Sequence, residues 1–248
     1  MLALILPRLL SVLSVLPGFE RELRLLPLLV QSGGTVIDIG ASNGIYSLPL
    51  ALLVGRAGSV VAIEPRRSAA RRLAWLARAL NLVNLRVRRA ALAAIAGPMT
   101  VVVPRRRFAV PGRSFIQPAA AGTATPELDD GLRSSEPEQC WATTLDQVAV
   151  RSGRVVDFMK CDVEGAELLV MAGGHEVLST HRPVILCEVE DRHSRRFGSS
   201  RDEFLAQMDH LGYVDVSDAT TDIDPRNVLL VPHERSAALR AALANHHT

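Results

Sequence analysis

The sequence predicts an α/β fold: a mostly parallel sheet of seven strands, with an antiparallel last strand and helices on both faces. Short β-branched runs alternate with segments of helical periodicity from residue 35 to residue 231. Apolar residues make up 48% of the 248-residue chain and charged residues 22%, which suits a large core and excludes disorder. Only a polar turn of nine residues, 218–226, joins the last two predicted strands. A parallel crossover needs more, so these strands must be antiparallel.

Residues 1–17 form an apolar segment with one narrow polar stripe. The segment is too short to span a bilayer, and it lacks the basic start and cleavage site of a signal peptide. We expect a helix that packs on the domain or on a partner chain; contact with a membrane surface is the alternative. With a second helix over 20–31, residues 1–33 form an N-terminal helical segment ahead of a main domain at 34–248.

The main domain is predicted to begin with strands at 35–39, 59–63 and 84–87 and helices at 45–54 and 66–80. Glycines bound the first strand, and β-branched residues fill the first two. The 66–80 helix is amphipathic, with leucines inward and arginines outward. Pro49 is tolerated in the 45–54 helix only if it falls in the first turn.

The second half is predicted to contain strands at 99–103, 155–161, 183–189, 213–217 and 227–231, and helices at about 165–180 and 201–211. We expect the reversed strand at an edge of the sheet. Residues 104–138 are rich in proline and glycine and are predicted to form a long loop or lid on the rim of the sheet. Such a lid would cover the acceptor site, by which we mean the place where a substrate binds. Arginine and phenylalanine alternate at its start, which suits a sugar or an anion; a solvated charge run is the alternative.

The run from Asp38 to Gly44 (DIGASNG) lies where the first strand gives way to a helix. Gly40 and Gly44 let the backbone approach a ligand closely, and ligands of open α/β sheets bind at the carboxyl ends of strands. Glu64 ends the second strand, where a carboxylate can accept hydrogen bonds from ribose hydroxyls.

Charge discriminates between two ligands for this turn. A dinucleotide places an anionic pyrophosphate there and typically requires G-x-G-x-x-G, which the turn lacks. Asp38 would repel that pyrophosphate but attract the ammonium and sulfonium of S-adenosylmethionine. The run therefore favours S-adenosylmethionine. A glycine turn with no ligand, and an NAD oxidoreductase, are the alternatives.

The run from Asp157 to Glu167 (DFMKCDVEGAE) ends the fourth core strand and crowds carboxylates around one lysine. Of the 28 basic residues, 27 are arginine, as codon bias would explain, and only Lys160 is lysine. A partly buried lysine needs an anionic partner, for which Asp162 or Glu164 would serve. A strand-end salt bridge is the plain interpretation, and a catalytic cluster is the functional one.

The strings VIDIGASNGIYSLPLA, VVAIEP, TTLDQV, DFMKCDVEGAELLVMAGG and RPVILCEVE together resemble the FkbM family of S-adenosylmethionine-dependent methyltransferases, over roughly residues 34–232. The Lys-x-Asp-Val-Glu-Gly-Ala-Glu string is the most specific part. The resemblance implies a Rossmann-like class I methyltransferase fold and O-methylation of a hydroxyl on a sugar, glycolipid or polyketide-type metabolite. Pro49 and the long 104–138 segment depart from the family pattern and put the substrate class in question.

The resemblance also implies a set of site residues. The methionine part of S-adenosylmethionine would be held by Asp38, Gly40, Ala41, Asn43 and Gly44. Glu64 would bind the ribose, Ala91 would lie near the adenine, and the signature beside the reacting centre is matched by Lys160, Asp162 and Glu164.

Asp162 is the predicted general base or metal ligand, because an alcohol is a poor nucleophile without one. Glu188 at the end of the next strand would complete a Mg²⁺ or Mn²⁺ site with Asp162, and a plain strand-end charge is the equal alternative. Whether the site binds a metal ion stays open at this point. His193 is a further candidate base, although a surface histidine is the expectation.

The net charge of +2 gives no global field that would attract nucleic acid. We expect a hydroxyl-bearing small molecule or glycolipid as partner, no nucleic acid, and a homodimer or membrane contact through the N-terminal helix. A nucleic-acid or other N-methyltransferase and a non-catalytic cofactor-binding protein are the alternative functions. Three cysteines without a CxxC pair favour reduced core residues in a cytoplasmic chain, with the inner membrane face as a second location.

Overall fold

The computed structural model describes residues 6, 8, 10–12, 14, 20–105, 115–116 and 133–247. The elements in chain order are η1 (Arg21–Leu25), α2 (Leu26–Leu29), β1 (Thr35–Ile39), α3 (Ser47–Val54), β2 (Ser59–Ile63), α4 (Arg67–Ala79), β3 (Leu85–Arg88), β4 (Ala91–Leu92), β5 (Gly97–Arg105), β6 (Phe115–Ile116), β7 (Arg133–Thr143), α5 (Leu145–Ser152), β8 (Phe158–Cys161), α6 (Glu167–Ala172), η2 (Val177–His181), β9 (Val184–Glu188), α7 (Asp191–Ser194), η3 (Arg195–Phe197), α8 (Arg201–His210), β10 (Tyr213–Asp215), η4 (Ser217–Ala219), β11 (Asn227–Pro232), α9 (His233–Ala244) and η5 (Asn245–His247).

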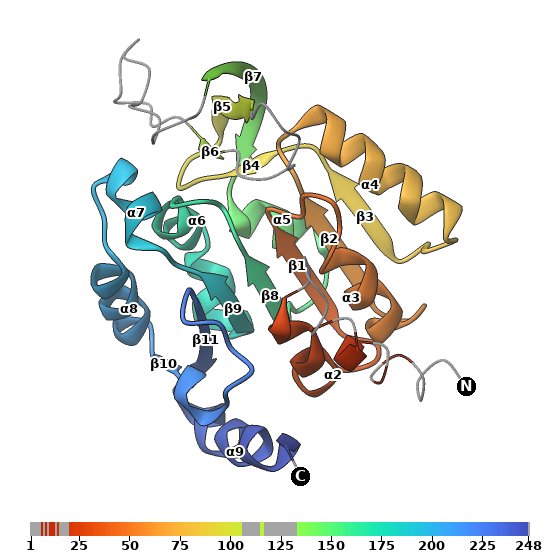
Figure 1. Ribbon diagram of the computed structural model, residues 1–248, viewed down its shortest axis with the longest axis vertical. Coiled ribbons are helices and arrows are strands. Elements are labelled where there is room, and N and C mark those ends of the chain that lie inside the picture. The colour runs from red at the N-terminus through yellow and green to blue at the C-terminus, as the bar shows by residue number, and fades with distance from the viewer. Residues whose placement is uncertain are drawn as a thin grey trace.

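The main sheet has seven strands in the order β10-β11-β9-β8-β1-β2-β3, with helices on both faces (Figure 1). Strands β9, β8, β1, β2 and β3 pair in parallel. Strand β1 is buried along its whole length, as expected for a parallel strand covered on both faces. The predicted α/β fold is confirmed.

The last strand of the sheet is antiparallel, as predicted, but it does not lie at the edge. Strand β11 is inserted between β9 and β10 and is antiparallel to both. The edge strand is β10, whose three residues leave little backbone unpaired. The short 218–226 connection fixes the direction of β11 but not the side of β10 on which it pairs, so the sequence alone gave the wrong position.

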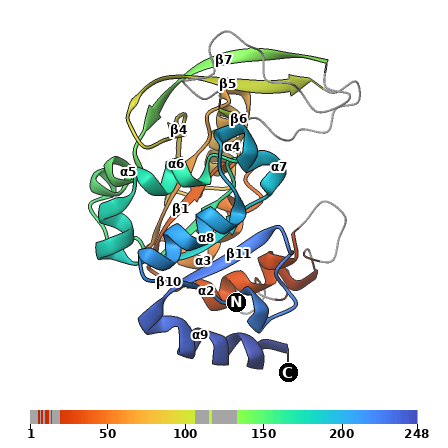
Figure 2. The ribbon, with the colours of Figure 1, turned by 90° about the vertical axis from the view of Figure 1, so that its left-hand side faces the viewer.

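Two apolar clusters cover the two faces of the sheet. One joins α2, α3, α4 and α9 to the sheet, and the other joins α5, α6 and α8 to the opposite face (Figure 2). Leu6 and Leu10 of the N-terminal helix are buried in the first of these clusters. The apolar N-terminal segment therefore packs on the domain through these residues. Within the part of the chain that the structure describes, no helix is long and apolar enough to cross a membrane.

Two predicted helices differ from the structure, and a third holds Pro49 where the sequence analysis allowed it. The 20–31 helix is split into the 3₁₀ turn η1 and the short helix α2. The 165–180 helix is broken at Gly173–Gly174, where a Cβ would meet the Ala93 carbonyl oxygen or the Leu145 side chain. These two glycines give close packing instead of helix, and a π-helical turn follows as η2. Pro49 is the third residue of α3, inside the first turn where it is tolerated.

A second sheet, in the order β4-β7-β5-β6, lies beside the main one (Figure 2). Strands β5 and β7 form a long antiparallel hairpin that extends the predicted 99–103 strand at both ends. Residues 104–105 and 133–138 are therefore strand, where the sequence predicted loop. The rest of the predicted lid, except residues 115–116, lies outside the described residues.

Candidate active site

A cavity of about 270 Å³ opens at the carboxyl ends of β1, β2, β8 and β9. Ala91 and Leu92 of β4 close one side, so the second sheet lies at this end of the main sheet. Nine of the ten predicted site residues line the cavity: Asp38, Gly40, Ala41, Asn43, Glu64, Ala91, Lys160, Asp162 and Glu164. The topology thus gathers residues that are up to 126 positions apart in sequence.

The tenth, Gly44, does not line the cavity. It has φ +83°, and a Cβ there would lie 2.4 Å from Leu73 Cδ1 of α4. Gly44 therefore lets the turn pack against α4, which is a structural role. Gly40 has φ +82°, and a Cβ there would lie 1.8 Å from the carbonyl oxygen of Asp162. Gly40 allows the β1 turn and the end of β8 to meet at the cavity floor.

A Gly40→Ala variant is expected to lose stability and the cavity together. The added methyl group would clash with the backbone just after β8, and alanine is strained at the positive φ of this turn. Neither strand end can move away without a loss of packing. We expect the unfolding temperature to fall by more than about 6 °C, which corresponds to about 2–3 kcal/mol for a chain of this size. Gly97→Ala is the control, because no atom lies within 4 Å of a Cβ built there. Equal unfolding temperatures for both variants would refute this role.

Glu64 is held rigidly at the end of β2. Its Oε2 accepts a hydrogen bond from the Ser42 backbone N–H at 2.7 Å. Its Oε1 accepts from the backbone N–H and the Nε of Arg66, both at 2.9 Å. Arg66 also donates to Ser42 Oγ at 2.8 Å, so one arginine ties both sides of the carboxylate. A carboxylate has more acceptor sites than these donors use, and the rest are available to a ligand in the cavity.

Lys160 is 1% exposed and makes no ion pair with any described carboxylate. Its ammonium lies over the Tyr46 ring, 5.2 Å from the centroid, and donates a long hydrogen bond of 3.5 Å to the Cys161 carbonyl. The strand-end salt bridge, one of the two interpretations of the sequence, therefore does not form among the described residues. Burial disfavours the ammonium, but the charges of Asp162, Glu20 and Glu188 outweigh it and raise the pKa.

Six carboxylates line the cavity with this single lysine: Glu20, Asp38, Glu64, Asp162, Glu164 and Glu188. Burial raises the pKa of Asp38 to about 6, against a hydrogen bond from the Ser47 hydroxyl and the charge of Lys160. Burial, with repulsion from Asp162, raises the pKa of Glu188 to about 8. Excess negative charge at close quarters makes the cavity a site for a cationic ligand.

Asp162 follows the last residue of β8, and its backbone N–H donates to the Ile39 carbonyl of β1 at 3.0 Å. Burial raises its pKa to about 6, Lys160 opposes this, and Glu164 adds to it. No described residue donates a hydrogen bond to its side chain, although the side chain lines the cavity. The carboxylate is thus positioned by backbone and left available to a ligand.

Glu164 contacts His193 of α7, with 3.0 Å between Oε2 and Nδ1. The sequence predicted a surface histidine, but His193 is 5% exposed. Glu164 itself has φ +55°, and a Cβ on Gly165 would lie 2.4 Å from the His193 carbonyl oxygen. The turn after β8 is therefore fixed against α7. Glu167 accepts a hydrogen bond from the Gly165 N–H at 3.0 Å, and burial raises its pKa to about 7.

Glu20 and Tyr46 line the same cavity and were not predicted from the sequence. The Tyr46 hydroxyl donates to Glu20 Oε2 at 2.6 Å, which ties the segment before η1 to the start of α3. Tyr46 lies in the VIDIGASNGIYSLPLA string, two residues after Gly44, and that position is the signal that could have found it; Glu20 lies outside every motif. Arg226 also lines the cavity, with its guanidinium 3.8 Å from Glu188.

The raised pKa values predict how stability depends on pH. A carboxyl whose pKa is higher in the folded than in the unfolded state stabilises the fold when protonated, and this is lost as pH rises through the folded value. Without ligand, the protein should therefore unfold at a lower temperature at pH 8 than at pH 5. Asp38→Asn should reduce this difference by about 1 kcal/mol, since one pKa unit is worth about 1.4 kcal/mol. An unchanged slope in Asp38→Asn, measured by thermal unfolding in matched buffers, would count against the raised pKa.

The donor set also indicates whether a metal fits. Among the described residues, no group of three or more His, Cys, Asp or Glu side chains is arranged to hold a metal ion. Asp162 and Glu188 both line the cavity, but they do not form such a group.

The sheet order, the glycine turn after β1 and the acidic residue after β2 define a class I, S-adenosylmethionine-dependent methyltransferase. The residues present fit that cofactor, because the cavity is acidic where the cationic methionine part would lie and apolar at Ala90–Leu92. The model of the methyltransferase FkbM domain matches residues 38–214. The chain belongs to the FkbM methyltransferase family.

One solved structure shares the fold, and a second is similar in part. The structure of the methyltransferase FkbM from Methylobacillus flagellatus has a TM-score of 0.50 and 13% identity; the match covers 93% of this chain and 58% of that one. A methyltransferase from Geobacter sulfurreducens has a TM-score of 0.47 and 14% identity, with 92% and 86% covered. A comparison with curated proteins found no match.

Proposed function

We propose that the protein transfers a methyl group from S-adenosylmethionine to a hydroxyl of a sugar, glycolipid or polyketide-type metabolite. The observation that carries this proposal is the Asp162 carboxylate, which lines the cavity without a hydrogen-bond donor from the described protein. An alcohol needs a base as it attacks, and a base with a pKa near the working pH is the most effective.

Different residues of the cavity would bind different parts of the cofactor. Asp38 would bind the ammonium group, and the turn at Gly40, Ala41 and Asn43 would hold the methionine part along its backbone. Glu64, fixed by Ser42 and Arg66, would accept hydrogen bonds from the ribose hydroxyls. Ala91 would contact the adenine. When bound, S-adenosylmethionine supplies a methyl group already activated on a positively charged sulfur.

The chain would contribute positioning and one proton transfer. As the acceptor oxygen gains the methyl group, its proton passes to Asp162. Lys160 lowers the pKa of Asp162, so the carboxylate is ionised near neutral pH. Glu164, anchored by His193, would orient the acceptor beside Asp162. Because the methyl donor is already activated, correct positioning of donor and acceptor supplies much of the rate acceleration.

The experiment that tests the function is an acceptor screen with methyl-labelled S-adenosylmethionine over glycans, glycolipids and polyketides, with and without EDTA. We expect label on the oxygen of at least one hydroxylated acceptor. Loss of transfer with EDTA, restored by Mg²⁺ or Mn²⁺, would assign Asp162 and Glu188 to a metal. Label on nitrogen or on nucleic acid, with none on hydroxyls, would overturn the proposal.

A further inference from the structure

The arginines are unevenly distributed along the chain. Residues 65–104 contain eight arginines and no aspartate or glutamate, although the whole chain carries a net charge of only +2. All eight arginines lie between Arg66 and Arg89, in or next to α4 and β3, and β3 is the edge strand of the main sheet. The basic residues are therefore gathered on one side of the molecule and are not neutralised within their own segment.

Helix α4 presents a continuous basic and aromatic stripe. Arg67, Arg71, Trp75 and Arg78 are spaced four, four and three residues apart, which places them on one face. All four are exposed, and Trp75 is 67% exposed. The opposite face buries Ala69, Ala70, Leu73 and Ala77 against the sheet. Packing against the sheet therefore explains the apolar face of α4, but it does not explain why Trp75 is exposed on the other face.

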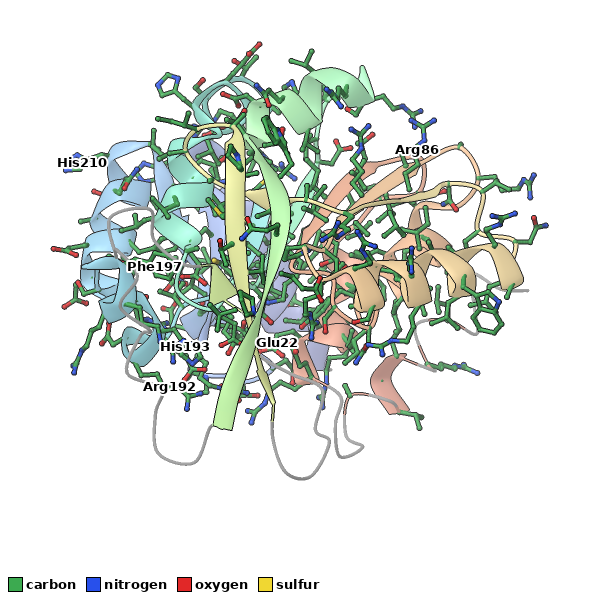
Figure 3. All side chains as sticks on the ribbon, turned by 90° about the horizontal axis from the view of Figure 1, so that it is seen from above. Glu22, Arg86, Arg192, His193, Phe197 and His210 are labelled. Carbon is green, nitrogen blue, oxygen red and sulfur yellow. The ribbon has the colours of Figure 1, made fainter. Side chains whose placement is uncertain are left out.

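An apolar tip continues this stripe. Leu80 and Val83 follow the helix and are 57% and 59% exposed. Arg78 precedes them. Arg86 of β3 is not part of this stripe: Figure 3 shows it on the side of the sheet away from α4, and its neighbours Leu85 and Val87 pack in the cluster that α4 joins. We call the exposed side chains of α4 and of residues 80–83 the α4 face. It combines exposed apolar groups with a surrounding positive charge.

The central arginines of the α4 face have no partner among the described residues. Arg71 and Arg78 make no hydrogen bond or ion pair through their guanidinium groups in that part of the chain. By contrast, Arg66 and Arg89 of the same stretch bind Glu64 and Gln139 within the protein. Two positive charges are thus available to an external anion at the centre of the α4 face.

We propose that the α4 face binds the surface of a lipid bilayer that contains anionic phospholipid. Arginines attract anionic headgroups, an exposed tryptophan is stabilised at headgroup level, and aliphatic side chains gain by insertion between the chains. A nucleic acid would use the arginines, but its phosphate backbone offers nothing for Leu80 and Val83. Arg66 lies at the start of α4 and lines the cavity, so the bound face adjoins the active site. This binding does not depend on which hydroxyl is methylated.

The test is co-sedimentation of the purified full chain with phosphatidylcholine vesicles, with and without about one third phosphatidylglycerol. We expect binding to the anionic vesicles only, weakened by salt. The double variant Arg71→Glu/Arg78→Glu should bind more than about tenfold less. Arg151→Glu is the matched control, because Arg151 is exposed on α5, which covers the opposite face of the sheet. Equal loss in the control, or no binding by the unmodified protein, would overturn the proposal.

Fluorescence of Trp75 gives a second readout. The chain has two tryptophans, so Trp141→Phe leaves Trp75 as the only reporter. Its emission should shift to shorter wavelength with anionic vesicles and stay unchanged with zwitterionic ones. Binding of RNA or DNA, with no vesicle binding, would contradict the proposal in favour of nucleic acid. S-adenosylmethionine binding by each variant, measured separately, reports whether the active site is intact, and vesicle binding requires no turnover.

Discussion

An Asp162→Asn enzyme should bind S-adenosylmethionine within a few-fold of the unmodified protein and lose methyl transfer by about 10²- to 10⁴-fold, the range for removal of a general base. The change is nearly isosteric, and the backbone N–H of residue 162 still donates to the Ile39 carbonyl. Only the ability of the side chain to accept a proton is removed. Parallel measurements of cofactor Kd and single-turnover rate separate the two effects.

The pH profile makes this prediction sharper. Activity of the unmodified enzyme should fall as pH drops through about 6, because Asp162 then gains a proton and stops acting as base. Asp38 titrates in the same range, so the profile should be taken at saturating cofactor. Asp209→Asn is the control, since that side chain is 73% exposed on α8. Near-native transfer by Asp162→Asn would assign the base elsewhere.

A Lys160→Arg enzyme should fold and lose about 10²-fold in activity, although the positive charge is kept. The lysine is completely enclosed, between the Tyr46 ring and the strand ends. A guanidinium is wider and carries five donors in a rigid fork, so the neighbouring carboxylates must move to accommodate it. A displacement of about 1 Å at a reacting centre is enough for a loss of this size.

Lys160→Met separates charge from shape. Without the ammonium, the pKa of Asp162 should rise above about 6, because Lys160 is the group that lowers it. The acid limb of the pH profile should then move to higher pH, which a purely structural lysine would not cause. Full activity in Lys160→Arg, or an unmoved acid limb in Lys160→Met, would make the single lysine an accident of composition.

Much of the fold was predictable because its signals are local. The strands at 35–39 and 59–63 have the predicted bounds, since buried parallel strands are short β-branched runs. The site was predictable for a related reason: residues after parallel strands meet at one end of the sheet. This brings Asp38, Glu64 and Asp162 to one cavity, although they lie far apart in sequence.

The remainder depended on contacts between distant segments. Nothing in the sequence near Glu20 indicates its hydrogen bond with Tyr46, and the burial of His193 follows from the turn at Glu164. The break at Gly173–Gly174 results from packing against Ala93 and Leu145. In each case, tertiary packing decides what local propensity leaves open.

The central claim is that this acidic cavity moves a methyl group from S-adenosylmethionine to a hydroxyl, with Asp162 taking the proton. The most direct test uses trideuteromethyl-labelled S-adenosylmethionine, the acceptor found by screening, and mass spectrometry of the product. The account predicts a trideuteromethyl ether formed by the unmodified enzyme and not by Asp162→Asn. A label on nitrogen or carbon, or the same ether formed at equal rate by both enzymes, would contradict it.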